Sequence, residues 1–234
     1  MKQLPLGLRL PAHAVFDSFA TGTNGEIVAA LRDSAAPAAL HATPLWLWGG
    51  HGSGKTHLLQ ATCAAAAGTG AYFSLDPALR LPAEALWGFE RAPVLCVDDV
   101  DKIAGVEEWE HALFQLFNAA GEFASTLVFA AAQAPRQIEW CLQDWRSRAG
   151  ACIVYHVQEL DDAGRAEALR LRAAQRGLQL PLETADYLLK RMPRDLPSLC
   201  RILDELDEAS LVAQRRLTIP FIRDALERHA GIKS

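Results

Sequence analysis

The chain has 234 residues, of which half are hydrophobic, and a net charge of -5 at neutral pH. This length predicts one sizeable core and leaves room for a small second domain. Charges, prolines or glycines interrupt every apolar run before it reaches the eighteen or so residues of a membrane span. Residues 1–11 lack the apolar stretch and cleavage site of a secretory signal. We therefore expect a cytoplasmic protein that does not contact membranes.

The net charge and the spacing of the cysteines and histidines exclude further classes of protein. An acidic molecule repels a phosphate backbone, so we expect no direct sequence-specific DNA binding. The cysteines are odd in number, scattered and without a C-x-x-C pair, and the seven histidines show no metal-ligand spacing. This pattern predicts reduced, mostly buried thiols rather than disulfides or a zinc site. The five are Cys63, Cys96, Cys141, Cys152 and Cys200.

The first two thirds of the chain alternate between strand and helix patterns. Residues 1–12 contain three prolines or glycines and predict an extended tail. Asn24 is expected to cap a short helix. Apolar runs predict strands at 45–48, 71–75, 93–97, 126–131 and 152–157, with helices at 55–67 and 106–122 among the connections. Such alternation predicts a parallel five-stranded sheet with helices on both faces, its ligand beyond the carboxyl ends of the strands.

From about residue 160 the pattern is helical throughout. Asp161 or Asp162 can cap a helix that ends at Gly177, and helices are expected at 183–192 and 196–216, with another that begins at Pro220. We therefore predict three parts: an extended tail at 1–12, an α/β nucleotide-binding domain at 13–159 and a small all-helical domain at 160–234.

The strongest motif is G-x-x-x-x-G-K-T, which follows a predicted strand and opens a predicted helix, as a phosphate loop requires. Its backbone N–H groups and the helix dipole favour phosphate. Lys55 is expected to reach the β- and γ-phosphates of ATP or ADP, and Thr56 to bind Mg²⁺. The expected nucleotide contacts and flanking residues are Gly49, Gly50, His51, Gly52, Ser53, Gly54, Lys55, Thr56 and His57.

A second signal is the pair of acids that ends the apolar run 94–97. Asp98 is placed to hold Mg²⁺ through water, and Asp99 to orient or deprotonate an attacking water. Apolar strands also end in an aspartate at ordinary turns, so the upstream phosphate loop decides in favour of the metal interpretation.

With these motifs in place, the sequence resembles AAA+ modules of the DnaA clade, and within it the regulatory inactivators of DnaA. The resemblance extends over almost the whole chain, through Phe16-Asp17-Ser18-Phe19, the phosphate loop, Asp98-Asp99 and Leu217-Thr218-Ile219-Pro220-Phe221. It implies an AAA+ fold with a helical lid. The basic DNA-binding domain that follows the lid in DnaA has no counterpart in the sequence.

The resemblance implies an arginine finger at Arg148, because Ser147-Arg148 matches the clade's Ser-Arg box. A finger acts on ATP held by a neighbouring subunit. Arg146 lies roughly 200° around a helix from Arg148, so only one of the two can face a given partner. The alternative for Arg148 is an ordinary surface salt bridge.

The resemblance also implies a lid arginine and a partner peptide. Arg194, in Met192-Pro193-Arg194-Asp195-Leu196, occupies the place where AAA+ lids present a sensor arginine to nucleotide, and its alternative is a solvated arginine at a helix start. The tail resembles a peptide that docks on the β sliding clamp through a glutamine and spaced apolar side chains. Its expected contact residues are Gln3, Leu4, Leu6 and Leu8.

The chain departs from the clade at the strand 127–133, where Ala130, Ala131 and Ala132 replace the polar first sensor. Gln133 is the only nearby polar substitute, and its register is one position late. We therefore expect tight nucleotide binding with slow intrinsic hydrolysis. The two phenylalanines Phe16 and Phe19 lie near the expected adenine site, although such residues more often belong to a core.

Together these patterns favour a regulatory protein that docks on the DNA-loaded clamp and triggers hydrolysis of ATP on the DnaA initiator. An autonomous ATPase such as a helicase loader, and a P-loop phosphotransferase, are the alternatives. Whether ADP or ATP is the working ligand, and whether the chain forms a homodimer, stay open.

Overall fold

The computed structural model describes residues 14–36, 43–193, 195–213 and 217–224. The expected clamp-docking residues Gln3, Leu4, Leu6 and Leu8, and the expected lid arginine Arg194, lie outside the described residues. The chain forms two compact units, of which the first comprises the segments up to Phe16 and from Asn24 to Glu159, and the second comprises Asp17–Thr23 and the chain from Leu160 onward.

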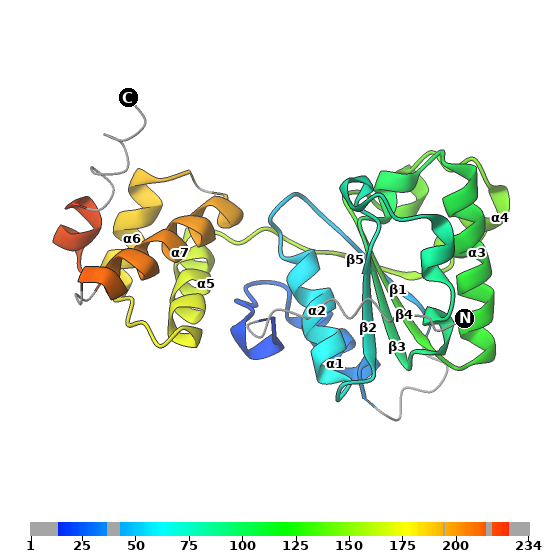
Figure 1. Ribbon diagram of the computed structural model, residues 1–234, viewed down its shortest axis with the longest axis horizontal. Helices are drawn as coiled ribbons and strands as arrows, with labels where there is room; N and C mark the ends of the chain where they lie inside the picture. The colour runs from blue at the N-terminus through cyan, green and yellow to red at the C-terminus, as the bar shows by residue number, and fades with distance from the viewer. Residues whose placement is uncertain (1–13, 37–42, 194, 214–216, 225–234) are drawn as a thin grey trace. The chain divides into compact units, whose positions relative to one another are not determined.

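The first unit contains a parallel five-stranded sheet (Figure 1). Its strands pair in the order β2-β3-β4-β1-β5. All run in the same direction, so the carboxyl ends of β1 and β3 lie at the same edge of the sheet, and the predicted α/β fold is confirmed. The strands are β1 Leu45–Trp48, β2 Gly70–Ser74, β3 Val94–Asp98, β4 Thr126–Ala131 and β5 Ile153–His156.

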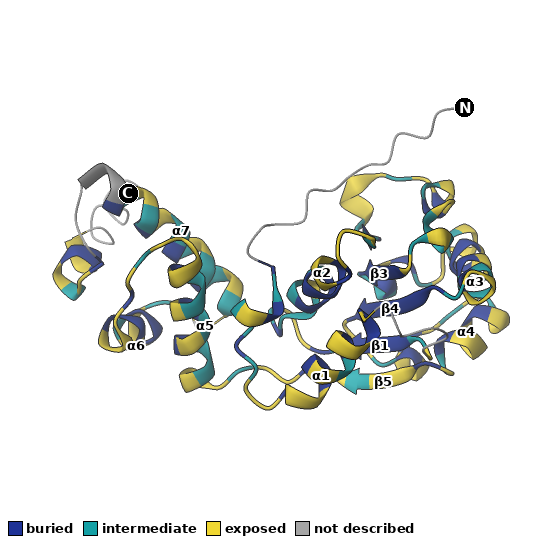
Figure 2. Ribbon diagram, turned by 90° about the horizontal axis from the view of Figure 1, so that it is seen from below, coloured by how far each residue is buried: buried dark blue, intermediate teal, exposed yellow. Residues whose placement is uncertain are grey.

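Helices cover both faces of this sheet, with α1 and α2 on one face and α3 and α4 on the other (Figure 2). The central strands are buried throughout, as near-continuous apolar runs in a parallel sheet predict. A cluster of aromatic rings lies under α3 and α4, where Phe129 and Trp145 are edge to face at 5.6 Å. The helices are α1 Gly25–Ser34, α2 Lys55–Ala65, α3 Glu107–Glu122 and α4 Gln143–Ala149.

Asn24 stands at the N-cap of α1, but its side chain does not cap the helix, which corrects the sequence-based expectation. The amide is buried and donates from Nδ2 to the carbonyl of Gln158 at 3.0 Å, while its Oδ1 accepts from the Gln158 N–H at 2.8 Å. The side chain thus closes two hydrogen bonds with the backbone that follows β5. A buried peptide group without partners is more costly than an uncapped helix end that water can reach.

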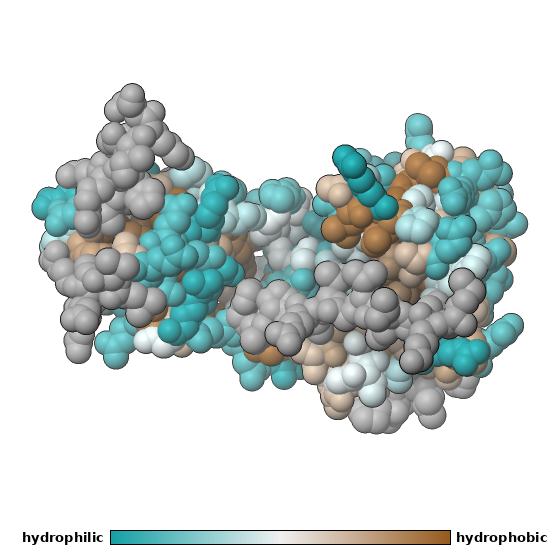
Figure 3. Space-filling view, viewed as in Figure 1, coloured by the Kyte–Doolittle hydropathy of each residue, from teal (hydrophilic) through white to brown (hydrophobic). Residues whose placement is uncertain are grey.

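Within its described residues the second unit contains helices and no strand, as predicted. Its helices are α5 Asp162–Gln175, α6 Leu182–Arg191 and α7 Leu196–Ala213, and residues 219–224 are also helical. Asp161 caps α5 by accepting from the Gly164 N–H at 2.7 Å. A core rich in leucine joins the helices, and hydrophilic residues form a band over this part of the surface (Figure 3).

Charged pairs also tie α5 to α7. Arg172 makes a two-pronged contact with Asp204, and Arg176 reaches both Asp204 and Asp207. Two guanidiniums therefore share three contacts with one carboxylate, a network that holds the helices in register more firmly than a single exposed pair. No helix within the described ranges has the length and apolarity required to cross a bilayer.

Candidate nucleotide-binding site

The phosphate loop joins β1 to α2 at the carboxyl edge of the sheet, and two of its glycines are fixed by geometry. Gly54, directly before α2, has a φ of 99°, a left-handed conformation that residues with a Cβ rarely adopt. A Cβ on Gly49 would lie 2.5 Å from the carbonyl oxygen of Val157, which belongs to rigid backbone. The loop therefore packs against the chain that leaves β5 without space for a side chain.

The polar atoms of the loop fit a bound phosphate. Lys55 donates from Nζ to the carbonyls of Gly49 at 2.8 Å and Gly50 at 2.9 Å. Burial lowers the pKa of Lys55, and neighbouring carboxylates act in the opposite direction. The Ser53 hydroxyl is buried and has no hydrogen-bond partner among the described residues, an arrangement that a ligand or ion can complete. Lys55, Ser53 and the N–H groups at the start of α2 would hold the phosphates.

The expected magnesium residues are in direct contact. Thr56 donates from Oγ1 to Oδ2 of Asp98 at 2.6 Å, and the Tyr72 hydroxyl donates to the same oxygen at 3.0 Å. The Asp98 side chain is buried, and this burial raises its pKa. A hydroxyl and a carboxylate are oxygen ligands of the kind that Mg²⁺ uses beside phosphates, so Thr56 and Asp98 fit the metal. Magnesium would neutralise phosphate charge there.

Asp99 follows directly, in the left-handed region with a φ of 61°. Ser74 donates from Oγ to Oδ2 of Asp99 at 3.1 Å, and Lys102 lies 3.1 Å from Oδ1. Both oxygens of the expected water-orienting carboxylate are therefore engaged. The sequence reasoning missed Ser74, Tyr72 and Lys102, although the alternation along β2 places the first two on one side of the strand, next to the paired acids.

The strand expected to lack a polar sensor is β4, and its alanines are buried. Gln133 is exposed, and its carbonyl accepts from the Trp46 indole at 3.1 Å. The expected flanking histidines differ in setting: His51 is exposed, while His57 Nε2 lies 3.0 Å from the carbonyl oxygen of Val15.

Phe16 is buried, and the guanidinium of Arg32 lies 5.0 Å from its ring centre. This agrees with the core interpretation of Phe16 rather than with an adenine platform. Phe19 is half-buried and belongs to the second unit.

Helix α4 of the α/β unit carries Arg148, the expected arginine finger. Trp145 and Ala149 of this helix are completely buried, whereas Arg146 and Arg148 are exposed. The guanidinium carbon of Arg148 lies 5.7 Å from the ring centre of Phe117, within the range of a cation–π contact. The helix is thus anchored on one face, and Arg148 remains accessible to a partner on another.

A buried acid, Glu110, holds the segment that leads into α4. It has no exposed surface, accepts from the N–H groups of Gly105 at 2.7 Å and Cys141 at 3.1 Å through Oε1, and from that of Leu142 at 2.7 Å through Oε2. Sequence reasoning missed this residue too. Its signal was an acid three residues before Leu113 on the apolar face of the predicted helix, where only a satisfied charge is tolerated.

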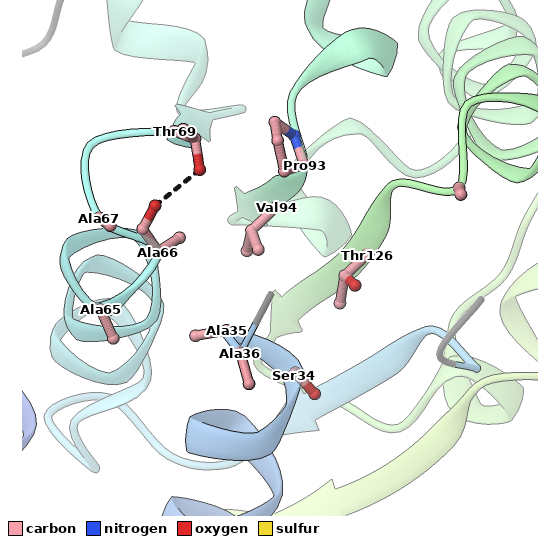
Figure 4. A pocket seen from close by; sticks show the side chains of 11 residues that line it. Ser34, Ala35, Ala36, Ala65, Ala66, Ala67, Thr69, Pro93, Val94 and Thr126 are labelled. Carbon is pink, nitrogen blue, oxygen red and sulfur yellow. Dashed lines mark hydrogen bonds between the residues drawn. The ribbon is translucent and has the colours of Figure 1, made fainter. Parts of the chain in front are cut away.

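A cavity of about 450 Å³ lies away from this site (Figure 4). Val94 and Thr126, the first residues of β3 and β4, line it together with alanines at and just beyond the C-terminal ends of α1 and α2. It is therefore at the amino ends of the strands, opposite the phosphate loop, and is not the nucleotide site. Within the described residues, no cluster of three or more metal-ligating side chains is present.

Known proteins match both parts of the chain. The family model of the bacterial DnaA ATPase domain matches residues 10–71, and that of the Hda lid domain matches residues 162–226. Domain III of the replication initiation protein DnaA from Thermotoga maritima is 20% identical, with a TM-score of 0.77 over 94% of this chain and 98% of that chain.

Two further structures show how widely the fold is shared. The DnaA of Aquifex aeolicus, bound to AMPPCP, is 22% identical, with a TM-score of 0.68 over 84% of this chain and 65% of that chain. The RuvB Holliday junction branch migration motor of Thermotoga maritima is 17% identical, with a TM-score of 0.63 over 87% of this chain and 68% of that chain.

The parallel sheet, the phosphate loop and the helical second unit have the fold of AAA+ proteins. The two family models narrow the comparison, because one matches the segment that contains the phosphate loop and the other matches the helical second unit. The two matched family models and the shared fold support an Hda-like AAA+ protein of the DnaA clade, in agreement with the sequence resemblance.

Proposed function

We propose that this protein binds an adenine nucleotide in its own phosphate loop and inserts Arg148 into the ATP site of the DnaA initiator. Hydrolysis there would convert the initiator to its ADP form and prevent a second round of initiation. The observation that carries the proposal is the setting of Arg148, an exposed guanidinium on a short helix whose other face is packed into the core. A planar cation held rigidly suits transition-state charge on a phosphoryl group.

The protein's own nucleotide has a structural role in this proposal. Thr56 and Asp98 fit Mg²⁺, and Lys55 fits the phosphates, yet both oxygens of Asp99 are engaged by Ser74 and Lys102. We expect Arg194 to contact the same nucleotide from the lid. Bound nucleotide would then persist for many turnovers of the partner.

The clamp supplies proximity to DNA in the same proposal. Gln3, Leu4, Leu6 and Leu8 form the docking peptide, and the net charge of -5 disfavours direct contact with DNA. Binding to a DNA-loaded clamp in the cytoplasm would raise the local concentration of Arg148 near initiators, as linked binding sites do.

The test mixes the purified chain with ATP-loaded DnaA, sliding clamp and DNA, and follows conversion of DnaA-bound ATP to ADP. We expect Arg148→Ala to lose about a hundredfold or more of the stimulation, as removal of arginine fingers does elsewhere. Arg146→Ala is the matched control, exposed on the same helix, and should retain stimulation within about twofold. Gln3→Ala should lose only the clamp-dependent part.

Absence of stimulation by the unmodified chain would remove the proposal. Equal losses in Arg146→Ala and Arg148→Ala would remove the assignment of the finger.

An autonomous ATPase, such as a helicase loader, is the alternative, and the complete phosphate loop with its Thr56–Asp98 contact favours it. It predicts rapid hydrolysis by the chain alone. Turnover above about one per second without DnaA, in the usual range for dedicated ATP-hydrolysing and kinase sites, would support it over the regulatory proposal.

A further inference from the structure

One carboxylate oxygen in the candidate site is shared by side chains of two other elements. Thr56 lies in α2 and Tyr72 in β2, and both hydroxyls donate to Oδ2 of Asp98 at the end of β3, at 2.6 Å and 3.0 Å. Asp98 is only 2% exposed, so bulk water has little access to this oxygen. The phosphate loop and the paired acids account for Thr56 and Asp98, whereas Tyr72 belongs to neither motif.

The pairing of β2 with β3 explains how Tyr72 reaches this oxygen. The parallel register places Tyr72 beside Cys96 and Ser74 beside Asp98. Because alternate residues of a strand share a face, Tyr72 and Asp98 lie on the same face of the sheet, with Tyr72 further back along the strands. A tyrosine ring is long enough to span this offset, so its hydroxyl rather than its ring contacts the carboxylate. A phenylalanine ring would fill the same space without the donor.

The donors around Asp98 nearly fill its capacity as an acceptor. An ionised carboxylate offers about four acceptor positions, two on each oxygen. Thr56 and Tyr72 occupy those of Oδ2, and the backbone N–H of Asp99 donates to Oδ1 at 2.9 Å. Among the described residues, this leaves one acceptor position, on Oδ1. The phenol of tyrosine keeps its proton at neutral pH and therefore acts as a donor here.

We propose that Tyr72 is a positioning residue of the nucleotide site: its hydroxyl holds Asp98 so that Oδ1 accepts from a water on the magnesium ion that accompanies bound nucleotide. Loss of the hydroxyl frees a lone pair on Oδ2 and one restraint on the carboxylate. Groups that orient a metal-binding side chain typically contribute about tenfold to a hundredfold to metal affinity. The phosphate contacts of the loop do not involve Tyr72, so only the magnesium-dependent part of nucleotide binding depends on it.

The inference rests on the nucleotide binding of the proposed function but not on the action of Arg148 on a partner. The experiment compares Tyr72→Phe with the control Tyr155→Phe in the full chain without DnaA. Tyr155 is half-buried like Tyr72, but it lies on β5 and outside the phosphate loop and the paired acids. A third chain carries 4-aminophenylalanine at position 72, which keeps a donor at the same place on the ring.

Three quantities are measured for each chain. Calorimetry gives the dissociation constant of AMPPCP in excess Mg²⁺ and in EDTA, and the ratio of the two constants reports how strongly metal and nucleotide are coupled. Electron paramagnetic resonance gives the affinity for Mn²⁺, used in place of Mg²⁺, in the presence of AMPPCP. The thermal unfolding midpoint without ligand shows whether the chain is folded.

We expect Tyr72→Phe to lower both the coupling ratio and the Mn²⁺ affinity about tenfold or more, and to leave the constant in EDTA within about twofold. Tyr155→Phe should change none of these quantities, and 4-aminophenylalanine should recover a large part of the loss. These readouts do not depend on hydrolysis.

Equal weakening in Mg²⁺ and in EDTA, or a Tyr72→Phe chain that no longer folds, would show that the hydroxyl only supports the fold and would overturn the inference. An unchanged ratio, an equal loss in Tyr155→Phe, or an unmodified chain whose AMPPCP binding is independent of Mg²⁺ would overturn it as well. An unmodified chain that binds AMPPCP in neither solution would instead contradict the proposed function itself.

Discussion

Replacement of Glu110 tests how the arginine-bearing helix is held. The carboxylate has no exposed surface and accepts hydrogen bonds from three backbone N–H groups, one before α3 and two directly before α4. A buried N–H left without an acceptor costs about 1–3 kcal/mol. Three lost partners therefore place Glu110→Ala at about 3–6 kcal/mol, after allowance for the desolvation that the carboxylate no longer requires.

Glu110→Gln removes the negative charge but keeps the shape of the side chain. A glutamine oxygen can still accept from Gly105 and Cys141, but its NH₂ group then faces the N–H of Leu142, so we expect a loss of about 1–3 kcal/mol. The loss should be accompanied by weaker stimulation of DnaA at temperatures where the variant is folded, because the segment before α4 is released.

Urea unfolding followed by circular dichroism measures these free energies. Glu108→Ala is the matched control, exposed on the same helix, and should change stability by no more than about 0.5 kcal/mol. A loss below about 1 kcal/mol in Glu110→Ala would show that water or other donors replace the carboxylate, and the reasoning would be refuted.

Three further predictions concern residues of the α/β unit. Burial raises the pKa of Asp98 above its ordinary 3.8, so the folded state binds the proton more tightly, and stability should fall as pH rises from 3.8 through the folded-state pKa. Asp98→Asn should remove this fall in pH-dependent urea unfolding and also remove magnesium-dependent nucleotide binding. Asn24→Ala should cost about 2–4 kcal/mol for two lost buried hydrogen bonds, and Asn24→Asp should not restore it in the same assay, because a carboxylate cannot donate. Gly49→Ala should weaken ATP binding about tenfold or more by calorimetry, whereas Gly121→Ala, in open space on α3, should leave binding unchanged and stabilise by about 0.5–1 kcal/mol.

The sheet could be predicted closely because its information is local. The strands predicted at 45–48 and 126–131 match β1 and β4 residue for residue, and the other three differ by one residue at their ends. Each is a short and mostly apolar run, as is usual for strands of a parallel sheet that helices cover, and this distinguishes the strands from their connections. The phosphate loop followed from the same local signals, since its glycines and lysine stand between a strand and a helix.

The side chains that complete the site could not be predicted, because their partners are distant in sequence. Asn24 has the local pattern of a helix cap, yet its amide bonds to Gln158, 134 residues away. Asp99 has the spacing of a water-orienting acid, but its orientation depends on Ser74, which the pairing of β2 with β3 places beside it. Spacing along the chain does not encode which of two neighbouring acids a tertiary contact will engage.

The loop Asp17–Thr23 belongs to the same compact unit as the lid helices, although the whole α/β sequence separates them. Gly22 approaches Leu160 so closely that an added Cβ would lie 2.9 Å from the leucine side chain. A fragment that begins at Leu160 would therefore lack the loop Asp17–Thr23, which belongs to its compact unit. A fragment that ends at Glu159 would keep this loop but expose the surface that the loop buries in the second unit. The complete second unit can be obtained by adding a peptide that ends at Thr23 to the fragment that begins at Leu160. A circularly permuted chain that joins the two segments would serve the same purpose.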